Sequence, residues 1–250
     1  MKSSSLLFDP ERHELFPAQR VWELGATVVV APHPDDESLG CGGVLALLAE
    51  AEKSPKVIVV TDGSRSHPNS KSHPQEKLAE LRERETLLAT EALGLRSDSV
   101  HFLRYRDCGL PPLESQAFTA AAERCAGLLE MLGIESIFVP WRRDPHCDHE
   151  LTWQLFHAAV RQLSTAPRWL EYPVWAWEHA ATDVAPREEE ASAWRLDIST
   201  VADRKNRAIQ QHRSQLGEVI RDDPKGFALT PAMLAHFSRG WELFIEPKDG

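Results

Sequence analysis

The segment Thr27-Val28-Val29-Val30-Ala31, which runs directly into Pro32-His33-Pro34-Asp35-Asp36-Glu37, decides the fold class. An unbroken run of apolar and β-branched residues predicts a strand that is buried on both faces. Similar runs recur downstream and alternate with segments of helical periodicity. The further strands are predicted over 57–61, 100–103 and 136–140, and the helices over 39–53, 74–93, 118–132 and 149–163. This alternation predicts an α/β fold, in which a mostly parallel sheet is covered by helices on both faces.

The last third of the chain has a less regular pattern. Strands are predicted over 169–177, 194–198 and 241–245, with a helix over 201–216. A chain of 250 residues is long enough for one sizeable α/β domain and does not require two. We therefore predict a single domain over residues 1–250.

The charge and composition argue against several classes of function. The chain has 28 basic and 38 acidic side chains and a net charge of −10, which argues against a nucleic-acid partner. No stretch approaches the roughly 20 apolar residues that span a bilayer. The apolar run at residues 6–8 is too short for the core of a signal peptide. The cysteines form no CxxC pair, so we expect a reduced cytoplasmic protein; they are Cys41, Cys108, Cys125 and Cys147.

Two polar motifs follow two of the predicted strands. His33-Pro34-Asp35-Asp36-Glu37 follows the strand over 27–31, and Asp144-Pro145-His146-Cys147-Asp148-His149 follows the strand over 136–140. The carboxyl ends of parallel strands meet at one edge of a sheet, so the two motifs can converge there. Together they supply three histidines and five acidic side chains. That inventory suits a catalytic zinc site, which needs three protein ligands and one open position.

Each motif also has an ordinary structural interpretation. A single His or Asp after a strand commonly forms a turn or caps a helix, and only the joint arrangement of the two motifs favours a metal site. The glycines of Gly40-Cys41-Gly42-Gly43 lack G-x-G-x-x-G spacing, because Leu45 stands where the third glycine belongs. We interpret these glycines as close-packing turn residues and reject a nucleotide cofactor. Cys41 and Cys147 are expected to be core or bystander residues.

The first motif, continued by Ser38-Leu39-Gly40-Cys41-Gly42-Gly43, resembles the first signature of the LmbE/PIG-L deacetylases. The run His146-Cys147-Asp148-His149 resembles their second signature, His-x-Asp-His. Weaker agreement is found at Thr61-Asp62-Gly63, Arg82-x-x-Glu85, Leu93-Gly94, Asp107 and Lys205 with His212-Arg213-Ser214-Gln215. The resemblance spans about residues 26–216. It implies a Rossmann-like sheet and the hydrolysis of acetamides on amino sugars such as N-acetylglucosamine conjugates.

Transferred position by position, the resemblance implies that His33, Asp36 and His149 bind one Zn²⁺ per chain. It implies that Asp35, next to the ligand Asp36, is the general base that takes a proton from the attacking water. This division of roles agrees with the chemistry, because zinc acidifies water and a neighbouring carboxylate accepts the proton.

The resemblance also implies roles for four further residues. His146 would donate to the tetrahedral oxyanion or to the departing amine, and Asp148 would orient and charge that imidazole. Arg82 and Asp107 are implied to bind sugar hydroxyls or an attached phosphate.

Two further features have more than one interpretation. The segment 62–73 follows a strand and is rich in turn residues, so it is either a surface loop or a lid that contacts substrate. His67 and His73 in this segment are candidate contacts. Trp175 and Trp177 lie two residues apart on a predicted strand and would face the same way, either as a platform for a ring or as core residues.

The sequence therefore predicts a zinc-dependent hydrolase that removes the acetyl group from an N-acetylated amino sugar conjugate, releasing acetate and a free amine. The alternatives are a metal-dependent amidase that acts on another acylated sugar or antibiotic glycoside, and a sugar-binding relative without turnover. Asp35 and His146 speak against the binder, which needs neither residue. The partner is a small molecule; the aglycone and the oligomeric state are left open, a homo-oligomer included.

Overall fold

The computed structural model describes residues 10–179 and 184–248. Its strands are β1 (Leu15–Phe16), β2 (Thr27–Ala31), β3 (Lys56–Thr61), β4 (Val100–Tyr105), β5 (Ser136–Pro140), β6 (Arg168–Tyr172), β7 (Ala191–Asp197) and β8 (Trp241–Pro247). Its helices are α1 (Asp36–Glu50), α2 (Gln75–Ala92), α3 (Gln116–Leu132), α4 (Cys147–Val160), α5 (Ala202–Ile209) and α6 (Pro231–Phe237). The apolar run at 6–8, considered above for a signal peptide, lies outside the described residues. Within them, no helix is long and apolar enough to cross a bilayer.

The strands form one sheet in the order β1-β7-β8-β6-β5-β2-β3-β4. From β6 to β4 all neighbours are parallel, and β8 runs antiparallel between β6 and β7. The chain passes from β2 to β3 on one side, and β5 returns to the opposite side of β2. The predicted mostly parallel sheet is therefore confirmed, and the strand order changes direction between β2 and β5.

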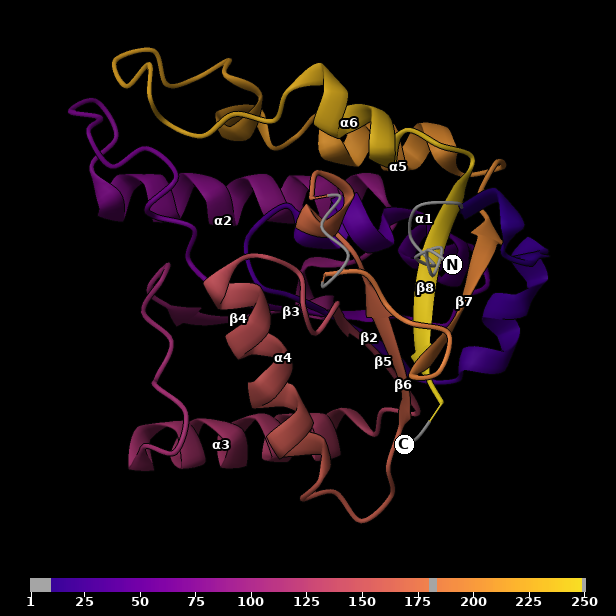
Figure 1. The fold of residues 1–250 in the computed structure, drawn as a ribbon. Helices are drawn as coiled ribbons and strands as arrows, with labels where there is room; N and C mark the ends of the chain where they lie inside the picture. Colours follow the sequence, from indigo (N-terminus) through magenta and orange to yellow (C-terminus); the bar gives the residue numbers. More distant parts are fainter. Residues whose placement is uncertain (1–9, 180–183, 249–250) are drawn as a thin grey trace, which may run out of the picture.

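Helices cover both faces of the sheet, as predicted (Figure 1). Along β2 and β3 successive side chains point to opposite faces. Val29 and Val57 pack in the core that contains residues of α1, α2 and α5, whereas Val28 and Ile58 pack with α3 and α4. Continuous apolar strands are needed because both of their faces are buried.

The glycines of α1 allow close packing. A Cβ atom at Gly40 would lie 2.2 Å from Tyr172, and one at Gly43 would lie 2.5 Å from Ile198. The close packing predicted for these glycines is therefore confirmed, whereas the predicted turn is wrong, because all three lie within α1. Cys41 is a buried core residue, as expected.

Two predicted elements extend well past their observed ends, whereas the other predicted boundaries lie within three residues of the observed ones. The strand predicted over 169–177 ends at Tyr172, and Trp175–Trp177 forms a 3₁₀ turn. Pro173 has no N–H to continue the ladder, and the next three backbone N–H groups donate to Asp144. The helix predicted over 201–216 ends at Ile209, and a 3₁₀ turn follows at Arg213–Leu216. Between them His212 leaves helical geometry and reaches the buried Glu37, 3.0 Å away.

Candidate active site

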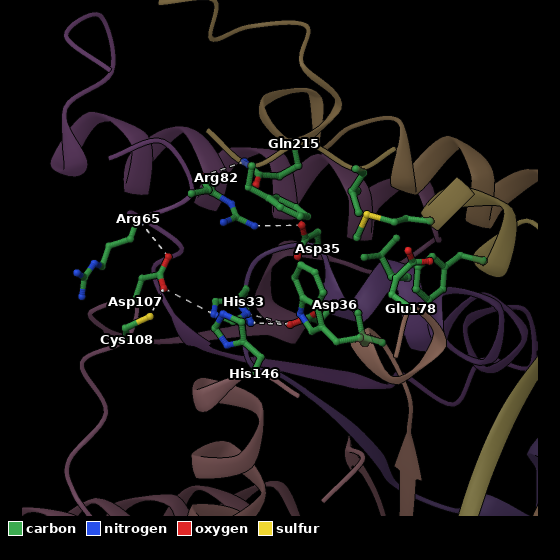
Figure 2. Close-up of a pocket in the computed structure, with 18 of the residues that line it drawn as sticks. His33, Asp35, Asp36, Arg65, Arg82, Asp107, Cys108, His146, Glu178 and Gln215 are labelled. Carbon is green, nitrogen blue, oxygen red and sulfur yellow. Dashed lines mark hydrogen bonds and ion pairs between the residues drawn. The ribbon is translucent and has the colours of Figure 1, made fainter. Parts of the chain in front are cut away.

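The two polar motifs meet at the carboxyl ends of β2 and β5, which are hydrogen-bonded neighbours. This is the point where the strand order reverses, and open α/β sheets bind ligands at such points. A cavity of about 650 Å³ opens there. Figure 2 shows His33, Asp36 and His146 near its middle, with Arg65 and Asp107 on one side and Glu178 on the other.

The candidate ligands His33 and His149 are arranged in the same way. Each points one ring nitrogen at Asp36: His33 Nδ1 lies 3.3 Å and His149 Nε2 lies 3.2 Å from Asp36 Oδ2. The other nitrogen faces a second buried carboxylate, with His33 Nε2 3.0 Å from Asp148 and His149 Nδ1 2.7 Å from Asp144. A carboxylate on the outer nitrogen fixes the tautomer of a metal-binding histidine and leaves the inner nitrogen free to coordinate.

These residues fit a divalent metal ion. His149 is fully buried, and its Nε2 and His33 Nδ1 both lie close to Asp36 Oδ2. Two imidazole nitrogens and one carboxylate oxygen make a three-ligand set that leaves a position open toward the cavity. A ring nitrogen of His146 lies within 4.8 Å of those of His33 and His149. The structure thus brings the three predicted ligands together in a metal-site-like cluster.

The pKa shifts of the residues in this cluster indicate that it accommodates positive charge. Burial lowers the pKa of His33, but hydrogen bonds to Asp148 and Asp36 outweigh it and raise that pKa to about 9. Burial likewise lowers the pKa of His149, but the charge of Asp36 and hydrogen bonds to Asp144 and Asp36 raise it to about 10. Burial raises the pKa of Asp36, but the charge of His149 and hydrogen bonds from both imidazoles hold it well below its usual range. The buried carboxylates favour positive charge at the point where a cation would be bound.

Asp35, the expected general base, caps the start of α1. Its φ of 131° lies in a region that side chains rarely adopt, and such strain is common at functional sites. The backbone N–H of Asp35 donates to Glu37, and Arg82 Nη2 lies 3.1 Å from its carboxylate. Burial raises the pKa of Asp35 to about 6, although the charge of Arg82 acts in the opposite direction. A carboxylate with such a pKa is poised to accept a proton near neutral pH.

Arg82 is buried rather than exposed on the surface of α2. Its guanidinium donates to the carbonyls of Gly63 and Pro34 in addition to its contact with Asp35. Gly63 is required at this turn, because its φ is 60° and a Cβ there would lie 2.3 Å from Arg82 Nη1. Glu85, three residues after Arg82 on α2, accepts hydrogen bonds from the backbone and hydroxyl of Ser214. Arg82 lines the cavity, and its role toward substrate stays a prediction.

The expected pairing of Asp148 with His146 is not the one observed. The Asp148 carboxylate accepts from Cys108 N at 2.8 Å and lies 3.0 Å from His33 Nε2. His146 meets Asp148 through the backbone, since Asp148 N donates to His146 Nδ1 at 3.2 Å. Burial and the neighbouring His33 and His149 lower the pKa of His146 to about 4, so this imidazole is neutral at neutral pH. The spacing of the motif could not predict that Asp148 contacts His33, because His33 follows a different strand.

Asp107 follows β4 and also reaches the cavity. Its Oδ2 accepts from Arg65 N at 2.9 Å, and its Oδ1 lies 3.8 Å from His33 Nε2. The carboxylate is therefore placed beside the candidate metal site, and its contact with substrate stays a prediction.

No individual role was predicted for Asp144 or for the pair of Glu37 and His212. Asp144 is fully buried, contacts His149 and binds the turn at 174–176. Glu37 accepts from Asp35 N and lies 3.0 Å from His212 Nε2, so it connects the base to the distant 3₁₀ turn. The available signals were the positions of Asp144 and Glu37 inside the two motifs and of His212 in the segment of weaker agreement.

Residues of the loop 62–73 line the cavity, as the lid interpretation requires; they are Arg65, Ser66 and Pro68. Trp175 also lines it, but Trp177 packs against Trp241 and His236. The prediction that both tryptophans face the same way is wrong, because they lie on a 3₁₀ turn rather than a strand. His67 and His73 are not among the cavity-lining residues.

The opposite half of the cavity has a largely apolar wall, most of which sequence reasoning missed. It is formed by Leu39, Val174, Trp175, Phe227, Leu229, Met233 and Phe237. Most of these residues lie beyond residue 216, where no motif was recognised and no helix was predicted for α6.

Comparisons with known proteins agree with this geometry. Residues 28–160 match the family model described as PIG-L, GlcNAc-PI de-N-acetylase. The chain is 26% identical over 215 residues to a 2'-N-acetylparomamine deacetylase of Streptomyces fradiae, covering 79% of this chain and 76% of that one. It is 28% identical over 201 residues to a probable N-acetyl-alpha-D-glucosaminyl L-malate deacetylase 2 of Bacillus cereus, covering 78% and 86%. The structure of an N,N'-diacetylchitobiose deacetylase from Pyrococcus horikoshii matches in fold with a TM-score of 0.69 and 22% identity, over 93% of this chain and 88% of that one.

Proposed function

Because the chain belongs to the PIG-L family, we propose that it is a zinc-dependent hydrolase that removes the acetyl group from an N-acetylated amino sugar conjugate. The observation that carries this proposal is the position of Asp35, a buried carboxylate that lines the cavity together with the candidate metal ligands His33 and Asp36. A base next to a Lewis acid is the arrangement that amide hydrolysis needs.

His33, Asp36 and His149 would hold the zinc ion, and their nitrogen and oxygen donors are those of known catalytic zinc sites. When bound there, zinc polarises the amide carbonyl and lowers the pKa of a water molecule to about 7. Asp148 and Asp144 orient the two imidazoles from outside. Asp36 lies between both rings and keeps them directed at one point.

Asp35 takes the proton of the attacking water. Arg82 and Glu37 hold Asp35 in its strained conformation, so its carboxylate is positioned before substrate arrives. As the water oxygen bonds to the acetyl carbon, the carbon–nitrogen bond breaks and the departing nitrogen needs a proton. His146 accepts a hydrogen bond at Nδ1, so its neutral ring carries the proton on Nε2 and can donate it to that nitrogen.

The cavity has a polar and an apolar half, and this division describes the substrate. Arg65, Arg82 and Asp107 lie on the polar side with charged groups suited to sugar hydroxyls. Phe227 and Met233 belong to the apolar wall. An amino sugar that carries an apolar aglycone matches both halves, whereas a sugar with a small charged aglycone leaves the apolar half unfilled.

The test is acetate release from a set of N-acetylglucosamine glycosides, measured by mass spectrometry of the deacetylated product. We expect aryl and alkyl glycosides to be turned over with a higher kcat/KM than free N-acetylglucosamine. Phe227→Ala should reduce that preference without abolishing turnover. His33→Ala is the negative control.

The same assay decides between the proposal and its alternatives. Binding of these glycosides without any acetate release would identify a sugar-binding relative. Release of a different acyl group at a much higher rate would identify an amidase of another specificity.

A further inference from the structure

Two exposed cysteines and a histidine meet beside the candidate active site. Cys108 follows β4, and Cys147 is the first residue of α4. Their separation along the chain gave no indication that the two thiols meet. We propose that Cys108, Cys147 and His146 form a second site, which binds a thiophilic divalent metal ion such as Zn²⁺ or Cd²⁺ and inhibits the enzyme when occupied. The inhibitory consequence rests on the deacetylase activity proposed above, whereas the metal site does not.

The distances fit coordination. The two sulfur atoms lie 3.7 Å apart. Two thiolates bound to one tetrahedral zinc ion at about 2.3 Å each are separated by about 3.8 Å. A ring nitrogen of His146 and both sulfur atoms all lie within 4.8 Å of one another. An ion can therefore be bound with only small movements of these side chains.

The surroundings favour a cation. Asp107 Oδ1 lies 3.4 Å from Cys108 Sγ, and Asp148 accepts a hydrogen bond from Cys108 N. Figure 2 shows Cys108 next to Asp107 and close to His33 and His146. Two thiolates and an imidazole leave a fourth position, which a water molecule or the nearby Asp107 carboxylate can fill. Binding of the ion releases the two thiol protons.

The site differs from the environment of the other cysteines. Cys41 and Cys125 are buried in separate cores, and neither belongs to a metal-binding group among the described residues. Cys108 and Cys147 are exposed, so an ion from solvent can reach them. Soft thiolate ligands select zinc and related ions over magnesium or calcium.

Occupation of this site acts on the reaction through His146. An ion bound by a ring nitrogen of His146 holds the imidazole toward the two cysteines, so the ring can no longer adjust its position to donate a proton to the departing amine. The candidate catalytic site contains no sulfur ligand, so the two ions can be distinguished spectroscopically. Excess zinc should therefore inhibit an enzyme that needs one equivalent of zinc.

The experiment starts from protein that carries one equivalent of Zn²⁺ and is kept reduced by a phosphine. Cd²⁺ is added while thiolate-to-cadmium charge-transfer absorption is recorded in the ultraviolet, and bound metal is counted after dialysis. In parallel, acetate release is measured against rising Zn²⁺. We expect about two ions per chain, a thiolate band and a fall in rate of about tenfold or more.

Cys147→Ser is the test variant, because Cys147 is exposed and does not line the cavity. It should bind one ion per chain and show no thiolate band, and its rate relative to its own starting value should resist excess Zn²⁺. Cys125→Ala removes a distant thiol and should behave like the parent.

The proposal is overturned if the parent shows no thiolate band, or if Cys147→Ser keeps the band and the second ion. A band without any inhibition would overturn the regulatory half alone. Absence of acetate release under all conditions would reject the proposed function, while the absorption titration still decides on the metal site.

Discussion

At the scale of single residues, Asp35 has a combination of features that only function explains. It is buried, has a strained backbone and is held by Arg82 and Glu37. We expect Asp35→Asn to keep its metal and its fold, because the amide preserves the shape of the side chain. Turnover should fall by ~10² to 10⁴-fold, since the amide cannot accept the water proton. Acetate-release kinetics together with metal analysis measure both effects, and near-normal turnover would remove Asp35 from the mechanism.

Arg82 affects both activity and stability, because its side chain is buried against Asp35. Arg82→Ala should lower kcat/KM by about ten- to a hundredfold. It should also lower the free energy of unfolding by about 3–5 kcal/mol, since a buried partner is left unpaired. Arg82→Lys should recover little activity, because lysine cannot donate to Asp35, Gly63 and Pro34 in the same geometry.

Arg84 is the matched control for this position, being an exposed arginine on the same helix α2. Arg84→Ala should leave the melting temperature and the kinetics nearly unchanged. An Arg82→Ala protein with parental kcat/KM and melting temperature would show that the buried ion pair is dispensable.

Motif spacing identified most of the residues that meet in the site, but it could not assign their partners. His33, Asp36 and His149 were expected together and do lie together. Which carboxylate supports which imidazole depends on the relative position of β2, β4 and β5, and this is not encoded in any local spacing. For that reason Asp148 was placed against His146 instead of His33.

At the scale of elements, the loop 62–73 is fastened to the segment after α5. Asp222 accepts from Ser70 Oγ, Lys71 N, Ser72 N and Ser72 Oγ at 2.7–2.9 Å. Phe227 N donates to Ser66 O at 2.7 Å, and both of these residues line the cavity. The loop therefore forms one wall of the cavity only while this contact holds.

Asp222→Asn should loosen the wall without harming the core, because the amide loses part of this acceptor set. We expect KM to rise by about three- to tenfold, with little change in kcat or melting temperature. Hydrogen exchange of the backbone at 69–73 should become faster. Asp98→Asn, which breaks the exposed pair with Arg96, is the control; equal exchange in the two variants would contradict the role of Asp222.

The pH dependence of this contact has a definite sign. Hydrogen bonds from Ser72 N, Ser70 Oγ and Ser72 Oγ hold the pKa of Asp222 well below its usual range. A carboxyl group whose pKa is lowered by folding stabilises the contact above its ordinary pKa of about 4. That stabilisation is lost progressively as the pH falls below about 4 and the Asp222 carboxylate becomes protonated. Protection at 69–73, corrected for intrinsic exchange, should therefore decrease on acidification in the parent and not in Asp222→Asn.

At the scale of the whole molecule, the parallel part of the sheet was predictable, whereas the C-terminal part was predicted only in part: the strands β7 and β8 were expected, and the helix α6 was not. The buried strands β2 and β3 contain short continuous apolar runs, and this pattern predicts a buried strand from the sequence alone. In the C-terminal part, two predicted elements end early because of contacts that no local window contains: Asp144 accepts from the backbone of the turn at 174–176, and His212 reaches Glu37. The apolar wall of the cavity comes largely from this part of the chain, so its chemistry became visible only in three dimensions.

We expect His33, Asp36 and His149 to hold a metal ion that the hydrolysis requires. This requirement is tested by acetate release from protein that is stripped with a chelator and then given one equivalent of Zn²⁺, with bound metal counted at each step. We predict that the rate falls to background when the metal is removed and returns with about one ion per chain. A stripped protein that contains no metal and still releases acetate at the full rate would contradict the account.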